Sequence, residues 1–150
     1  MEHQHMSEPD LVGRDALHFC LNLNRATAVL TRHIDHRLSA LHGLSLNDFT
    51  VLYCVAQAPQ GKVRRSDLAT QLGLTASGVT RLLLPLEKIG LITRLPDIRD
   101  ARISYVALTP TGSELLSHAL SSATHISEDL IGHVPGMQLQ ALSTLLDSLK

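Results

Sequence analysis

The residues best suited to chemistry lie between positions 64 and 102, where arginines and hydroxyl-bearing side chains recur over a short stretch. Arginine presents several N–H donors in a planar fork that fits phosphate oxygens and the edge of guanine, and hydroxyl groups bond to either. Such a set suits an anionic partner. The candidate contact residues are Arg64, Arg65, Thr75, Ala76, Ser77, Thr80, Arg81, Arg99 and Arg102.

Charge is distributed unevenly along the chain, although the formal net charge is only −1. Residues 62–105 hold eight basic and four acidic residues, a local charge of +4, whereas the remainder holds five basic and ten acidic residues. The local excess, rather than the total, is the electrostatic footprint of a nucleic-acid-binding protein. We therefore expect a basic face over residues 62–105 and an acidic remainder that faces away from the nucleic acid.

Hydrophobic periodicity and turn residues indicate the elements that must position these side chains. A polar loop over residues 96–102 separates two expected strands, and a last helix follows Pro135-Gly136 and carries a leucine-rich face. The other expected helices cover about residues 10–41, 45–58, 66–72, 75–89 and 110–132, and the strands cover residues 91–95 and 103–108.

Local capping patterns mark several of these boundaries. The expected N-cap residues are Ser45, Ser66 and Thr75. Asp48 lies three residues after the first of them, as in a capping box, and Gly73 suits the left-handed position that ends a helix. Pro85 falls inside the expected fourth helix, where it removes one amide, so we expect a kink there.

These elements predict a mainly α protein with a small β-hairpin wing (α+β), a winged helix-turn-helix with terminal dimerisation helices. The expected organisation is a disordered tail over residues 1–9, a helical dimerisation region over 10–43 and 111–150, and a winged helix-turn-helix over 44–110, together forming one composite domain. The terminal helices carry more leucine than one helix face needs. This favours a homodimer over packing of these helices on their own domain.

Four sequence segments, in this order and spacing, resemble the MarR family of bacterial winged-helix transcriptional regulators. They are LATQLGLTASGVTRLL, LEKIGLITR, the loop that holds Asp97, Arg99, Asp100 and Arg102, and VALTPTGSELL. The resemblance extends from about residue 15 to residue 149. It implies an obligate homodimer and a DNA-binding regulator, most often a repressor, that recognises a pseudo-palindromic operator in double-stranded DNA with half-sites about 10 base pairs apart.

The start of the expected fourth helix is the candidate recognition surface. Small residues there let the helix enter the major groove closely, its hydroxyls can bond to phosphates or bases, and Arg81 can make a bidentate contact to guanine. The opposite apolar face supplies the packing. Arg64 and Arg65 precede the third helix, where they either anchor the DNA backbone or form ordinary surface charge.

The loop between the two strands is the candidate wing. By resemblance, Arg102 enters the minor groove, Asp100 orients its guanidinium, Asp97 supports the loop, and Arg99 contacts a phosphate. Many family members have an arginine where this chain has Ala101, so one wing charge is missing. The alternative is a solvated, charged loop with no partner.

The resemblance also implies an effector, commonly a small aromatic acid or a phenol, in a pocket between the dimerisation helices and the DNA-binding lobe. The candidate pocket residues are His33, Arg37, Phe49, Tyr53 and His118. Cys20 is the candidate for redox sensing, but the tyrosines that surround such a thiol in peroxide-sensing relatives are replaced here by Ile34 and Leu46. The nine histidines do not supply four converging ligands by spacing, so no metal site and no cofactor are expected.

Other classes of protein fit the sequence less well. The chain lacks G-x-S-x-G, H-E-x-x-H, C-x-x-C and a phosphate-binding glycine loop, so an enzyme is not expected. A winged helix that binds protein instead of DNA would carry an apolar or acidic face in place of this basic one. The apolar runs are too short for a membrane span, and the polar start lacks the features of a secretory signal, so we expect a cytoplasmic protein.

Overall fold

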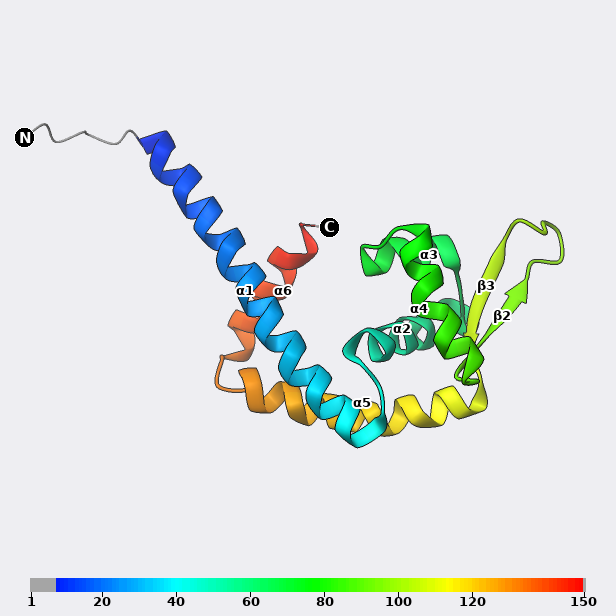
Figure 1. Ribbon diagram of the computed structural model, residues 1–150. Helices are drawn as coiled ribbons and strands as arrows, with labels where there is room; N and C mark the ends of the chain where they lie inside the picture. Colours follow the sequence, from blue (N-terminus) through cyan, green and yellow to red (C-terminus); the bar gives the residue numbers. More distant parts are fainter. Residues whose placement is uncertain (1–7, 150) are drawn as a thin grey trace, which may run out of the picture. The chain divides into compact units, whose positions relative to one another are not determined.

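The computed structural model describes residues 8–149, and its elements confirm the mainly α fold with a small sheet (Figure 1). Of these residues, 8–33 belong to one compact unit and 34–149 to a second. The helices are α1 (Glu8–His42), α2 (Leu46–Gln57), α3 (Arg65–Leu72), α4 (Ala76–Lys88), α5 (Pro110–Ile131) and α6 (Gly136–Asp147). A 3-10 turn, η1 (Pro59–Gly61), precedes the strands β1 (Lys62–Arg64), β2 (Ile92–Pro96) and β3 (Ser104–Leu108).

Most of the tail expected over residues 1–9 lies outside the described residues, and α1 begins at Glu8. None of the helices in residues 8–149 combines the length and the hydrophobicity of a membrane-spanning segment.

The sheet has three antiparallel strands in the order β1-β3-β2, so the expectation of a two-stranded hairpin was incomplete. In β3, Val106 pairs with Val63 of β1 on one side and with Arg94 of β2 on the other. Three residues are too few for an alternating pattern to appear in the sequence, which explains why β1 escaped prediction. Because β1 pairs with β3 and runs directly into α3, the wing strands are anchored to the start of α3.

The main core surrounds α2, which packs against α3, α5 and β3 (Figure 1). Its fully buried residues include Val51, Leu52, Leu68, Leu83 and Leu86. A smaller cluster joins the end of α1 to the middle of α5 through Leu38, Ala123 and Ile126. These clusters bury the inner faces of α2 and α4 and leave the outer face of α4 exposed.

Most of the expected caps are present. Ser45 and Asp48 form the full capping box of α2, Thr75 caps α4, and Gly73 ends α3 at φ +64°. The expectation that Ser66 caps α3 was wrong. Because β1 runs straight into α3, the extended Arg64 occupies the cap position and no side chain bonds to the free amides there.

Helix α4 continues through Pro85 to Lys88, so the proline does not end the helix. Pro85 is exposed on the helix surface and its carbonyl oxygen accepts the amide of Ile89. Because proline has no amide, the Arg81 carbonyl lacks its usual helical donor, and the exposed position lets water take that place.

The end of α4 and the start of α5 meet in a tight joint. The Thr109 hydroxyl donates to the Gly90 carbonyl, and the Thr109 amide donates to the Leu91 carbonyl at 3.1 Å. Gly112 lies so close that a Cβ added there would stand 1.9 Å from the Leu91 carbonyl oxygen. Only glycine leaves room for this approach.

Replacing Gly112 with alanine should therefore lower the free energy of unfolding by about 3 kcal/mol, because the clash is with backbone and not with a flexible side chain. Urea unfolding at fixed protein concentration measures this. Gly13→Ala is the matched control, since a Cβ there meets nothing within 4 Å. Equal unfolding midpoints for the Gly112 variant and the wild type would contradict the expectation.

Candidate nucleic-acid interface

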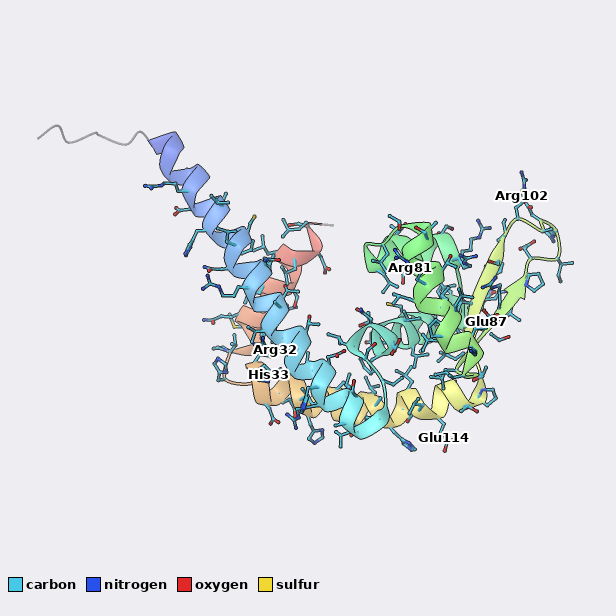
Figure 2. All side chains as sticks on the ribbon, in the orientation of Figure 1. Arg32, His33, Arg81, Glu87, Arg102 and Glu114 are labelled. Atoms are coloured by element: carbon cyan, nitrogen blue, oxygen red, sulfur yellow. The ribbon has the colours of Figure 1, made fainter. Side chains whose placement is uncertain are left out.

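The outer face of α4 presents the residues expected to contact DNA. Thr75, Ala76, Ser77 and Arg81 are exposed, whereas Val79 and Leu83 on the opposite face are buried. The Thr75 hydroxyl accepts the Gly78 amide at 3.1 Å and lies 3.2 Å from the Ser77 hydroxyl. Figure 2 shows Arg81 on this helix, and no ion pair engages its guanidinium within residues 8–149.

Thr80, by contrast, faces inward. Its hydroxyl donates to the Ala76 carbonyl at 2.9 Å and accepts a hydrogen bond from Nη2 of Arg65. Both residues are half-buried. The structure thus places Thr80 and Arg65 in a contact between α3 and α4, where they position the helix. The buried Nε of Arg65 has no hydrogen-bond partner among the described residues.

The wing loop is organised by two aspartates. Asp97 accepts the amides of Arg99 and Asp100 at 2.7 and 3.0 Å. Asp100 accepts the Arg102 amide at 2.9 Å and holds the guanidinium of Arg102 through Nε and Nη2, both at 3.0 Å. The orienting contact expected between Asp100 and Arg102 is therefore present. The Arg102 side chain is nevertheless 89% exposed, and Figure 2 shows it projecting from the tip of the hairpin.

These contacts keep the loop charged. The two backbone amides hold the pKa of Asp97 below its ordinary value. The guanidinium of Arg102, followed by its amide, lowers the pKa of Asp100, and the pKa of Arg102 is raised in return by Asp100. Each shift arises from hydrogen bonds to the charged form, so the pairing persists at neutral pH.

Tyr105, in β3, joins the wing to the start of α3, and the sequence analysis missed it. Nε of Arg64 lies 3.4 Å from the Tyr105 hydroxyl, and a hydrogen bond from Tyr105 also lowers the pKa of Asp97. Nζ of Lys62 lies 4.7 Å from the centre of the Tyr105 ring. The alternation along β3 could have flagged this residue, but its partners depend on pairing with the unpredicted strand β1.

A second arginine of the sheet is restrained in the same way. Nη2 of Arg94, in β2, lies 3.2 Å from Oε2 of Glu87 in α4. Arg94 carried no role in the sequence analysis beyond its charge. The pair connects α4 to the first wing strand, β2.

Two of the five residues expected in the effector pocket line the same pocket. Phe49 and Tyr53 of α2 line a pocket of about 420 Å³ against α5 and Leu139 of α6. Arg37 instead bonds to Asp129 at 2.7 Å, and His118 is exposed on α5; neither lines the pocket.

The remaining candidates lie elsewhere. His33 and the exposed Cys20 belong to the unit formed by residues up to 33. A second thiol, Cys54, is half-buried in α2, and burial raises its pKa, which disfavours the reactive thiolate.

The hydrogen bonds of the wing loop predict how its two aspartates titrate. In carboxyl-carbon NMR, Asp97 and Asp100 should both titrate below the ordinary aspartate value. Because folding depresses both pKa values, the contribution of these contacts is complete above about pH 4 and is lost as the pH falls through the depressed values. Arg102→Gln should return the pKa of Asp100 towards its ordinary value and leave Asp97 low, because backbone amides hold Asp97. Titration of Asp100 at its ordinary value in the wild-type protein would exclude the pairing in solution.

Comparison with known proteins agrees with this geometry. Residues 44–104 match the MarR family. The crystal structure of the transcriptional regulator BldR from Sulfolobus solfataricus superposes with a TM-score of 0.80 and 24% identity, covering 95% of this chain and 99% of that one. Sco3205, a MarR family transcriptional regulator from Streptomyces coelicolor solved in complex with DNA, superposes with a TM-score of 0.78 and 21% identity. That match covers 99% of this chain and 89% of Sco3205. A MarR mutant from E. coli, solved with operator DNA, superposes with a TM-score of 0.78 and 20% identity, covering 90% of this chain and 95% of that one. The fold is that of a winged helix.

Proposed function

Because residues 44–104 match the MarR family, we propose that the chain is a member of that family and a DNA-binding transcriptional regulator, a homodimeric repressor that a small aromatic molecule releases from a pseudo-palindromic operator. One observation carries the DNA-binding part of the proposal. The exposed Arg81 on α4 and the exposed Arg102 on the wing lie on the winged-helix surface, and Arg102 is held in place by Asp100. Similar structures solved with DNA support the same partner.

In this proposal α4 enters the major groove with its N-terminal end. The small and hydroxyl residues there permit close approach, and Arg81 contacts a base edge or a phosphate. Thr80 and Arg65 bond to each other between α3 and α4 and so restrain this helix. The wing delivers Arg102 to the adjacent minor groove, where narrow A·T segments attract a guanidinium.

Exposed apolar residues on the terminal helices support the homodimer. On α1, Val12, Leu17 and Leu21 are each more than half exposed. On α6, the exposed Leu142, Leu145 and Leu146 share one apolar face, and the exposed Leu149 follows just after the helix ends. Solvent-exposed apolar surface of this kind is characteristic of a protein interface. Two copies would place two α4 helices about one turn of DNA apart, and a dimer seated over a promoter would repress it.

The test of DNA binding is fluorescence anisotropy across a salt series, on a duplex selected from random sequence. We expect binding that weakens steeply with salt and a stoichiometry of two chains per duplex by light scattering. Arg81→Ala and Arg102→Ala should each weaken binding by about 10-fold to 100-fold, equivalent to about 1–3 kcal/mol, because each removes a groove contact.

Lys88→Ala is the matched control, because it removes the same charge at the far end of α4 and should change affinity little. Binding that does not respond to salt, or equal losses in all three variants, would favour a winged helix that binds protein. One chain per duplex would contradict the homodimer.

Release by an aromatic effector should require the pocket under α2. Thr124 lines it from α5 and is exposed, so Thr124→Phe should fill it without disturbing the core. We expect this variant to bind the operator like the wild type but to resist release by 2-naphthol. Ser117→Phe places the same ring on α5 outside the pocket and should remain releasable. Equal release of both variants would locate the effector elsewhere.

A further inference from the structure

The pocket between α2 and α5 has walls suited to a flat apolar ligand. The rings of Phe49 and Tyr53 stack at 6.1 Å between centroids with an interplanar angle of 19°. Opposite them, α5 contributes Leu120, Ala123 and Ile131, and Leu139 of α6 completes the apolar lining. Aromatic ligands stack favourably on such ring pairs.

The charge of the pocket comes from one residue. Glu128 is the sole charged side chain among the lining residues, which include no lysine, arginine or histidine. Its carboxylate makes no ion pair within the described part of the chain. The other polar groups of the lining are neutral hydroxyls from Tyr53, Thr124 and Ser127.

The basic residue that could have served an anionic ligand is engaged elsewhere. Arg37 donates to Asp129 at 2.7 Å, although Asp129 is the immediate neighbour of Glu128 on α5. Asp129 therefore pairs with this arginine, whereas Glu128, which is exposed to solvent, lines the pocket without an ion-pair partner among the described residues. A ligand carboxylate placed here would meet Glu128 with no compensating cation.

We propose that this pocket selects aromatic cations, a class that carries a flat ring system and a protonated amine, over the aromatic acids. The ring would stack on Phe49 and Tyr53, and the ammonium group would pair with Glu128. Two attractions act together, since a cation is drawn to the faces of aromatic rings as well as to the solvent-exposed carboxylate of Glu128. The proposal rests on the ligand response proposed above and names the chemical class of the effector.

Three ligands with one ring system test the charge preference. They are 1-naphthylmethylamine, 1-naphthol and 1-naphthoate, which at neutral pH are cationic, neutral and anionic. Isothermal titration of the full chain in the absence of DNA should show the amine binding on the order of tenfold more tightly than the naphthoate. Glu128→Gln should abolish this ratio, and Thr124→Lys, which adds a cation to the lining, should invert it.

Glu114→Gln is the control, because Glu114 is an exposed acid on α5 outside the pocket (Figure 2) and its removal should leave the ratio unchanged. Naphthoate binding as tightly as the amine to the wild type, an unchanged ratio in Glu128→Gln, or no binding of any of the three would overturn the proposal. Because these titrations contain no DNA, their outcome is independent of operator binding. Release of the selected duplex by the amine is then a separate measurement of the proposed function.

Discussion

The close approach of Gly112 to the Leu91 carbonyl is the constraint on which the arrangement of α4 and the wing depends. At this joint α4 has just ended, β2 begins, β3 has just ended and α5 begins. Hydrogen bonds from Thr109 to Gly90 and Leu91 close it. The recognition helix and both wing strands are thereby tied to the first turn of α5. Because α5 also lines the pocket, any ligand that moved α5 against α2 would act on all three at once.

The basic face works through restrained arginines. Arg65 bonds to Thr80, Arg94 to Glu87, and Arg102 to Asp100. The two exposed ion pairs, those of Arg94 and Arg102, contribute little to stability. They hold long side chains in one geometry, which would lower the entropy lost on the DNA binding proposed above. Glu87 and Asp100 also each offset one positive charge of this face.

Local signals in the sequence predicted most of the fold. The capping box at Ser45, the Thr75 cap and the left-handed Gly73 depend on residues a few positions apart, so they are visible without tertiary structure. The features that escaped depend on distant partners. Strand β1 exists because it pairs with β3, and that pairing moved the start of α3 away from the expected cap at Ser66. The hydrogen bond between Arg65 and Thr80 likewise joins two helices and could not be read from either one alone.

The pocket shows how one distant contact can move an expected pocket residue elsewhere. By resemblance, Arg37 was a candidate pocket residue, on a helix expected to line the site. In the structure, Asp129, 92 residues further along the chain, takes up that arginine. Asp129 and Glu128 are adjacent, yet successive residues of a helix point about 100° apart, so only one of them meets Arg37. Arg37 lies outside the pocket, whose lining carries one negative charge, from Glu128, beside two aromatic rings. These electrostatics underlie the preference for aromatic cations proposed above.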